Sequence, residues 1–407
     1  MTFNKEKKMA ERNLNFDEII ERHNTNSLKY DTAAKNGLPG DVLPLWVADM
    51  DFRVSSYIQD AVIKQAEHGI YGYSDVGSGY FDAAAGWMKK QFDWETKEDW
   101  LIRTPGVVFA LAAAVKALTS EGDGVIIQRP VYYPFGAVIS NNNRRVVDNT
   151  LKVDENGYYS IDFEDFEHKI ISENVKLFIL CNPHNPSGRV FGREELEKLG
   201  NICLKYNVIV VSDEIHSDLV FEGRHTVFAS VKPEFAENCV ICTAPSKTFN
   251  IAGLQVSNIF APNKKIRQAI KNEINSLGYS RLNSAGLAAC EAAYRHGGEW
   301  YDAMKKYVKA NMDFMYDYIQ KNIPELKMRK PEGTYLVWID FRGLGLSDKQ
   351  IDDLAINKAK LWLDSGRIFG DTGSGFQRVN VACPRKLLEQ ALERLEKAIS
   401  LITANAL

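Results

Sequence analysis

The sequence predicts an α/β fold with a mostly parallel central sheet and a smaller second domain. From about residue 100, segments with helical periodicity alternate with short β-branched runs, an order typical of parallel sheets. The chain has 407 residues, which at about 150 residues per domain favours two or three domains. With 45% hydrophobic and 25% charged residues, its composition is globular and excludes disordered, collagen-like and coiled-coil chains.

Four apolar runs are expected to form buried strands, because continuous apolar runs suit strands that are covered on both faces. They are VIIQ (125–128), KLFILC (176–181), VIVVSD (208–213) and CVICTA (239–244). One helix is expected to follow Thr104-Pro105-Gly106, and another is expected over REELEKLGNICLKYN (193–207).

The pattern changes after about residue 285. Long amphipathic helices are expected over roughly 286–322, then a strand TYLVWIDF (334–341) and a terminal helix after Pro384. We therefore expect a large α/β domain over 51–285. The small α+β domain would be built from both chain ends, 1–50 and 286–407.

The net charge and the hydropathy of the chain limit the kinds of partner that we expect. The chain carries 50 Lys and Arg against 53 Asp and Glu, a net charge of −3, so no polybasic surface for nucleic acid is expected. No run approaches the roughly 18 apolar residues of a membrane-spanning helix. The first residues lack the apolar core of a secretory signal, and we expect a cytoplasmic protein.

The cysteines and histidines predict neither a disulfide framework nor a metal site. Six cysteines are spread along the chain, which suits reduced thiols. Cys239 and Cys242 form C-x-x-C, but a strand would point them to opposite faces. The seven histidines include no pair with the spacing of metal ligands.

Unusual polar residues follow the ends of the predicted strands, where open α/β sheets bind ligands. They are Gly106, Tyr132, Asn185, Asp213 and Lys247. Each alone has an ordinary explanation, such as a turn residue, a helix N-cap or a surface lysine. Their order is more informative than any one of them.

Asn185, Asp213 and Lys247 occur in the order found in fold-type I pyridoxal-phosphate enzymes, and the chain resembles that aminotransferase superfamily along nearly its whole length. Its motifs further resemble the MalY/PatB branch of cystathionine or cysteine-S-conjugate β-lyases. The motifs are WVADMDF (46–52), GYS (72–74), PVYYPF, NPHNPSGRV, VSDEIHSD, SKTFNIAGL and RVNVACPR.

The resemblance implies pyridoxal 5'-phosphate as cofactor and a role for each of these residues. Lys247 would bind the cofactor through its amine and serve as the base that removes the substrate α-proton. Asp213 would face the ring nitrogen and keep it protonated. Asn185 would donate to the phenolic oxygen, and Tyr132 would stack on the ring, with Tyr133 as a competitor for that role.

His216 stands three residues after Asp213, where many aminotransferases have a tyrosine. This departure favours the lyase branch and a contact with the cofactor. A structural histidine explains it equally well.

The phosphate is expected at the helix N-terminus formed by Gly106, Val107 and Val108, with help from the Ser246 hydroxyl. Ala244 and Gln255 stand where better-known aminotransferases often have a serine and a phosphate-binding arginine. The individual phosphate ligands therefore stay open.

Two further residues are implied by the resemblance alone. Arg378 would bind the substrate α-carboxylate through its planar guanidinium. Tyr73 would reach the phosphate of a neighbouring subunit, which implies a homodimer with shared active sites.

The implied reaction is β-elimination from an amino-acid thioether such as cystathionine, giving a thiol, pyruvate and ammonia. Lys247 would also assist the departing thiol. Two alternatives stay open: an aminotransferase that uses the same residues, and a regulatory binding protein of the MalY kind.

Overall fold

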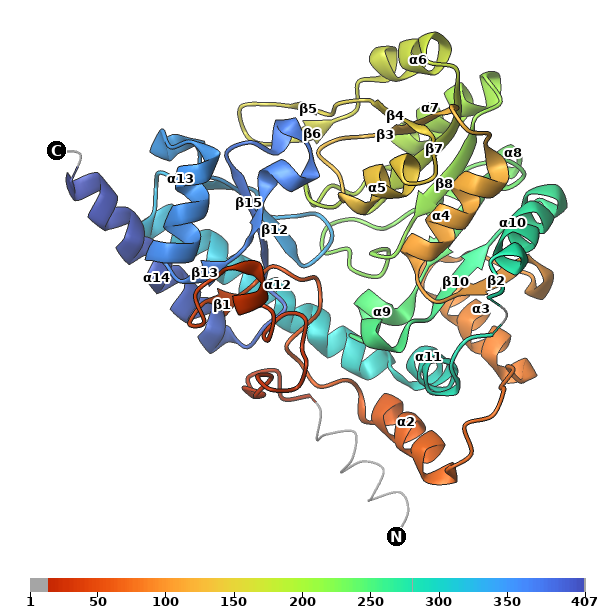
Figure 1. Ribbon diagram of the computed structural model, residues 1–407, viewed down its shortest axis with the longest axis horizontal. Coiled ribbons are helices and arrows are strands. Elements are labelled where there is room, and N and C mark those ends of the chain that lie inside the picture. Colours follow the sequence, from red (N-terminus) through yellow and green to blue (C-terminus); the bar gives the residue numbers. More distant parts are fainter. Residues whose placement is uncertain (1–13, 280, 406–407) are drawn as a thin grey trace.

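A seven-stranded sheet organises the first two thirds of the computed structural model, which describes residues 14–279 and 281–405 (Figure 1). Its order is β2-β10-β9-β8-β7-β3-β4, and only β10 runs against its neighbours. The strands are β2 (Leu101–Thr104), β3 (Gly124–Ile127), β4 (Arg145–Asp148), β7 (Val175–Cys181), β8 (Ile209–Asp213), β9 (Cys239–Thr243) and β10 (Ser257–Phe260). The four predicted runs are confirmed as four consecutive strands of this sheet.

Helices cover both faces of the sheet, as the continuous apolar strands require. One face packs against α4 (Val107–Leu118), α5 (Pro134–Ser140) and α10 (Lys264–Ser276). The other packs against α6 (Phe163–Ser172), α7 (Arg193–Lys205) and α8 (Pro233–Ala236).

Strand β9 carries the two cysteines of the C-x-x-C pair on opposite faces, as predicted. Cys239 belongs to the apolar cluster under α7, and Cys242 belongs to the cluster under α4. Both thiols are buried and free. Among residues 14–279 and 281–405, no group of histidine, cysteine and carboxylate side chains is arranged to hold a metal ion.

Side-chain caps explain where several helices begin. Asn263 accepts hydrogen bonds from the Lys265 and Ile266 amides at the start of α10. Asn283 caps α11 (Ser284–His296) in the same way through the Gly286 amide. Such oxygens satisfy amides that have no partner within the helix.

The C-terminal third builds a second sheet, with order β11-β12-β15-β14 and antiparallel pairing throughout. Its strands are β11 (Lys327–Met328), β12 (Leu336–Asp340), β14 (Asp364–Ser365) and β15 (Phe376–Asn380). It is accompanied by α12 (Gly298–Asn322), α13 (Asp348–Asp353) and α14 (Arg385–Asn405). The predicted strand at 334–341 and the terminal helix are confirmed.

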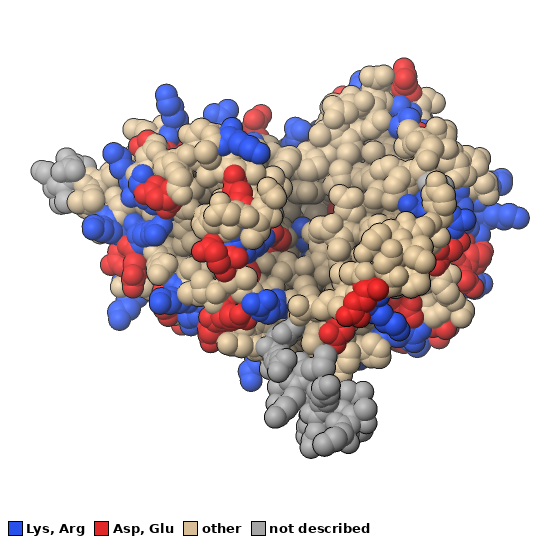
Figure 2. All heavy atoms as spheres, turned by 60° about the horizontal axis from the view of Figure 1, so that its bottom comes forward, with Lys and Arg blue, Asp and Glu red and all other residues tan. Residues whose placement is uncertain are grey.

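The N-terminal segment lies against this C-terminal part. β1 (Leu43–Pro44) pairs in parallel with β13 (Leu361–Trp362). The division into a large domain (51–285) and a small domain from both chain ends (1–50 and 286–407) stays a prediction. Figure 2 shows the surface hollowed between the two parts, with charges of both signs interspersed around the outside.

Two further helices and a two-stranded sheet lie outside the central sheet. α2 (Ser56–His68) and α3 (Ser78–Phe92) pack against α11, and β5 (Lys152–Val153) pairs with β6 (Tyr159–Ser160). None of the helices in the described part of the chain combines the length and apolar character needed to cross a bilayer.

A pair of glycine substitutions tests the packing of α7 against α8. A Cβ at Gly200 would lie 2.3 Å from the Phe235 ring, whereas a Cβ at Gly86 in α3 would meet no atom within 4 Å. Replacing an unhindered helical glycine by alanine gains about 0.5–1 kcal/mol. We expect Gly86→Ala to raise the midpoint of thermal unfolding and Gly200→Ala to lower it. Equal shifts of both variants, measured by calorimetry, would contradict this packing.

Candidate active site

A cavity of about 220 Å³ lies where the carboxyl ends of the central strands meet. Segments after β2, β3, β7, β8 and β9 contribute to its walls, as expected for an open α/β sheet. Every predicted site residue except Tyr73 and Arg378 lines it: Gly106, Val107, Val108, Tyr132, Asn185, Asp213, His216, Ser246 and Lys247.

Lys247 lies in α9 (Pro245–Thr248), the short helix that follows β9. Its Nζ donates a hydrogen bond of 2.9 Å to the carbonyl oxygen of Ala48. Burial lowers the pKa of this amine to about 8, although the Asp49 carboxylate opposes the shift. A buried amine with a lowered pKa suits a nucleophile or base near neutral pH.

Asp213 is the last residue of β8, and its carboxylate faces the same cavity. One oxygen accepts a hydrogen bond from the Ile215 amide, so the residue does not cap a helix. Burial raises the pKa of this carboxyl to about 7. A cationic ring nitrogen beside it would favour the charged form and reverse that shift.

His216 is buried beside the same cavity, and its ring meets the Tyr335 ring edge to face at 6.1 Å. Burial lowers its pKa to about 3, and the charges of Lys247 and Arg378 add to that effect. The imidazole is therefore neutral at pH 7. Its Nδ1 is buried and has no hydrogen-bond partner among the described residues, which leaves it available to a ligand.

Tyr132 forms another wall, and burial raises the pKa of its hydroxyl to about 12. Its amide donates to the Asn185 carbonyl at 3.0 Å, which joins two walls of the cavity. Tyr133 is half exposed and is absent from the cavity lining, in agreement with the preference for Tyr132.

Arg378 belongs to β15 in the second sheet and does not line the cavity, but it contacts Asn185, which does. Its Nη1 donates to Asn185 Oδ1 at 2.9 Å, and its Nη2 donates to the Trp46 carbonyl at 2.9 Å. Nη2 also pairs with the Asp364 carboxylate. The Nε atom is buried and has no hydrogen-bond partner in the described part of the chain, so the guanidinium still has a donor to offer.

The predicted anion site is at the start of α4, and Gly106, Val107 and Val108 there line the cavity. Gly106 precedes it with φ of +154°, a conformation that L side chains rarely adopt, and a Cβ there would meet no atom within 4 Å. No side chain caps this helix N-terminus in the described part of the chain, and its first residues line the cavity, which suits an anion. Ser246 and Gln255 also line the cavity.

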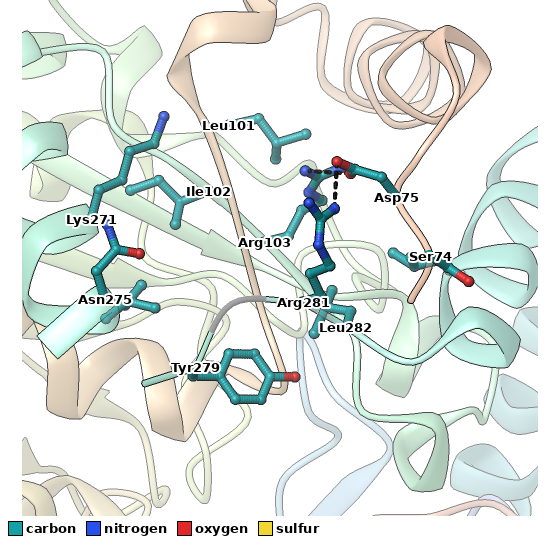
Figure 3. Close-up of a pocket in the computed structure, with 12 residues that line it drawn as sticks. Ser74, Asp75, Leu101, Ile102, Arg103, Lys271, Asn275, Tyr279, Arg281 and Leu282 are labelled. Atoms are coloured by element: carbon teal, nitrogen blue, oxygen red, sulfur yellow. Dashed lines mark hydrogen bonds and ion pairs between the residues drawn. The ribbon is translucent and has the colours of Figure 1, made fainter. Parts of the chain in front are cut away.

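Tyr73 lies outside its own subunit's cavity, with its side chain 99% exposed. The segment that carries it is fixed two residues later, where Asp75 pairs with Arg103 at 3.3 Å and Arg281 at 2.7 Å (Figure 3). These residues line a separate cavity of about 310 Å³, which contains none of the predicted catalytic side chains.

Sequence reasoning missed several groups at the site. The Ala48 carbonyl belongs to the backbone, so its residue type gives no signal. Tyr335, just before the apolar strand β12, donates to the same carbonyl at 2.9 Å, and its sequence context is that of a core residue. Asp364 could have been noticed as a carboxylate inside the otherwise apolar run LWLD (361–364).

The chain is similar in sequence to known proteins along most of its length. The sequence pattern described as "Aminotransferase class I and II" matches residues 46–395. The chain belongs to this family. Cystathionine beta-lyase PatB from Bacillus subtilis is 44% identical over 388 residues, which cover 95% of this chain and 100% of that protein.

Two solved structures are similar over the same length. Cystalysin from Treponema denticola, which contains pyridoxal 5'-phosphate, is 39% identical with a TM-score of 0.92, over 95% of this chain and 99% of that one. A PLP-bound protein from Clostridium difficile 630, provisionally named an aminotransferase, is 45% identical with a TM-score of 0.92 over the same shares. The predicted family, its PatB-type branch and the fold-type I architecture are confirmed.

The cavity fits pyridoxal 5'-phosphate on its own chemistry. It offers a buried amine, a buried carboxyl that needs a cationic partner, an unpaired imidazole nitrogen and a free helix N-terminus. These groups match the aldehyde, the ring nitrogen, the ring oxygen and the phosphate of that cofactor.

The raised pKa of Asp213 predicts that the free energy of unfolding of the cofactor-free protein depends on pH. Its folded-state pKa of about 7 exceeds the usual 3.8, so the folded protein holds a proton that the unfolded chain has released between these values. The contribution of Asp213 to stability therefore declines as the pH rises from about 4 to about 7. We expect the unfolding midpoint of cofactor-free wild-type protein to fall relative to that of Asp213→Asn across this range. A difference that stays constant with pH would contradict the shift.

Proposed function

We propose that the chain acts as a pyridoxal-phosphate-dependent carbon–sulfur lyase that cleaves cystathionine and other cysteine S-conjugates by β-elimination. The products are a thiol, pyruvate and ammonia. The observation that carries the proposal is the Lys247 amine, which has a lowered pKa, shares a cavity with Asp213 and lies near the Arg378 guanidinium. The full-length similarity to PatB supports this choice of reaction.

The cofactor, when bound, supplies the electron sink that stabilises the carbanion formed on loss of the α-proton. Asp213 would face its ring nitrogen, Asn185 and His216 its phenolic oxygen, and Tyr132 its ring face. Its phosphate would lie on the amides of Gly106, Val107 and Val108 and on the Ser246 hydroxyl. All of these residues line one cavity.

The chain's own groups then bind the substrate and move its protons. Arg378 binds the α-carboxylate, and its hydrogen bond to Asn185 fixes the guanidinium against the cofactor site. Lys247 Nζ takes the α-proton, which its pKa of about 8 allows near neutral pH. The same atom returns that proton to the departing sulfur as the carbon–sulfur bond breaks.

We further propose a homodimer in which Tyr73 completes the phosphate site of the partner subunit. Tyr73 is fully exposed, and Tyr71 in the same segment is 73% exposed. The pairing of Asp75 with Arg103 and Arg281 holds this segment against its own subunit (Figure 3). A fixed segment with exposed aromatic side chains suits a contact with a second copy of the chain.

The reaction is tested by incubating the purified protein with L-cystathionine. Wild-type protein is expected to release pyruvate without any added keto acid and to absorb near the violet edge of the visible. Lys247→Ala should lose this absorption and lower the rate of pyruvate release at least about 100-fold, since the base is gone. Amino transfer to 2-oxoglutarate without pyruvate release would instead identify an aminotransferase.

The shared site is tested by mixing two inactive variants, Tyr73→Ala and Lys247→Ala. In a mixed dimer one of the two sites has both native residues, so random exchange should restore about a quarter of the wild-type activity. The matched control is a mixture of Tyr71→Ala and Lys247→Ala, because Tyr71 is another exposed tyrosine of the same segment. A mixture of Tyr73→Ala and Lys247→Ala that stays inactive, although subunit exchange is demonstrated, would contradict the shared site.

A further inference from the structure

Asp218 is a buried carboxylate that is bonded to the helix carrying Lys247. It lies in the turn after β8, two residues after His216, and 7% of the residue is exposed. Its Oδ1 accepts a hydrogen bond from Trp87 Nε1 at 2.9 Å, and its Oδ2 accepts one from Thr248 Oγ1 at 2.6 Å. Thr248 is the residue after Lys247 and is fully buried. The carboxylate therefore holds the immediate neighbour of the amine.

Both hydrogen-bond donors of this carboxylate are neutral, and it forms no ion pair in the described part of the chain. The Trp87 ring also meets the ring of Phe249 at 5.2 Å and that of Tyr301 at 5.4 Å, so the surroundings are largely aromatic. Burial raises the pKa of the Asp218 carboxyl, and its two hydrogen bonds oppose the shift. A carboxylate in such a place costs free energy that its hydrogen bonds must offset, so packing alone does not explain it.

The two donors require a carboxylate because they converge on one side chain from different helices. Trp87 belongs to α3 and Thr248 belongs to α9. The two oxygens of a carboxylate accept hydrogen bonds and donate none, whereas an asparagine would turn its NH2 group toward one of the donors. The backbone carbonyl of Asp218 accepts a third bond at 2.7 Å, from the Tyr301 hydroxyl of α12. Asp218 thus joins three helices.

Helix α9 needs this anchor because it has only four residues. A single helical turn gains little stability from its own hydrogen bonds, so contacts with the rest of the fold determine its position. Among the residues that the structure describes, its side chains form two hydrogen bonds: Lys247 Nζ donates to the Ala48 carbonyl, and Thr248 Oγ1 donates to Asp218. The first bond is lost when the amine reacts. The second then remains.

The same bond connects two walls of the cavity. Lys247 and His216 both line it. The Leu219 amide donates to the His216 carbonyl at 2.8 Å and closes the turn that contains Asp218. The bond from Thr248 to Asp218 therefore fixes the lysine segment relative to the histidine segment.

We propose that Asp218 is a positioning residue that holds the Lys247 amine in the cavity through its hydrogen bond with Thr248. This assignment rests on the function proposed above, in which Lys247 binds the cofactor and removes the α-proton. Asp218 is not part of the cavity lining and acts through α9. A displacement of about 1 Å can slow a catalysed step by about 100-fold, so a loosened α9 is expected to slow the steps in which the amine takes part.

Two substitutions each remove one hydrogen bond from the same carboxylate, and only one of them frees α9. Thr248→Val removes the bond to α9 and keeps the shape of the side chain, whereas Trp87→Phe, the matched control, removes the bond to α3. We expect Thr248→Val to lower kcat for pyruvate release from L-cystathionine about tenfold or more and to change KM less than about twofold, because the amine is displaced and Arg378 is not. Trp87→Phe should keep kcat within about twofold of wild type. Thr248→Ser keeps the hydroxyl and should restore most of the rate.

A second readout does not depend on the substrate. Cofactor-free protein is mixed with pyridoxal phosphate, and its uptake is followed by the absorption near the violet edge of the visible. Because the amine forms the bond to the cofactor, uptake should be slower in Thr248→Val and close to the wild-type rate in Trp87→Phe and Thr248→Ser. Calorimetry of the three variants compares their unfolding midpoints, which both Thr248→Val and Trp87→Phe should lower.

Equal losses of kcat and of uptake rate in Thr248→Val and Trp87→Phe would give Asp218 a role in stability alone and overturn the proposal. Wild-type rates in Thr248→Val, or a Thr248→Ser protein as slow as Thr248→Val, would overturn it as well. If wild-type protein releases no pyruvate, the β-lyase function is overturned, and the uptake rates still decide the role of Asp218.

Discussion

The backbone of residues 46–52 is the constraint on which the site depends, because side chains from the second sheet and from the segment after β9 are bonded to its carbonyl groups. Arg378 and Asn380 reach it from β15, Lys247 reaches it from α9, and Asn250 reaches it from the turn after α9. The bonds join Arg378 to Trp46 at 2.9 Å, Asn380 to Val47 and Asp49 at 2.7 Å, Lys247 to Ala48 at 2.9 Å and Asn250 to Met50 at 3.0 Å. This one segment fixes the distance between the amine and the guanidinium that must act on the same substrate.

Ion pairs at Asp49 and Asp51 hold this segment in place. Asp51 pairs with Arg22 at 2.5 Å and with the fully buried Lys29 at 2.7 Å, and Asp49 pairs with Arg22 at 2.7 Å. Buried ion pairs add little net stability, because their desolvation offsets their attraction, but removing one partner leaves an uncompensated buried charge. The network also keeps the Asp49 charge near Lys247, where it opposes the loss of the proton that burial favours.

The sequence predicted the central strands and most of the cavity because both follow from local patterns. Continuous apolar runs identify strands buried on two faces, and parallel strands bring their carboxyl ends to one edge. Asn185, Asp213 and Lys247 follow three neighbouring strands, so adjacency in the sheet explains why they meet. Arg378 and Tyr73 carry no such local signal, and only the family resemblance indicated them.

The sequence alone could not predict contacts between segments that lie far apart along the chain. The Lys247 amine rests on a carbonyl 199 residues away, and the Tyr335 hydroxyl reaches the same oxygen from 287 residues away. Backbone acceptors leave no residue-type signature, because any side chain can stand beside them. The pairing of Asp364 with Arg378 depends on the register of β14 and β15, and two paired residues in β14 are too few for an apolar pattern to set that register.

The electrostatics of the cavity shows why such a site must be built by the whole fold. Burial raises the pKa of Asp213 to about 7 and lowers that of Lys247 to about 8, so each group is displaced toward its neutral form. Within residues 14–279 and 281–405 neither group has a charged hydrogen-bond partner, since Asp213 accepts from the Ile215 amide and Lys247 donates to a carbonyl. A ligand with a basic ring nitrogen would give Asp213 a charged partner. The reactive carbonyl of the same ligand would give Lys247 a group to bind. The stability lost by burying these groups is thereby returned as binding energy, which ties the fold to its cofactor.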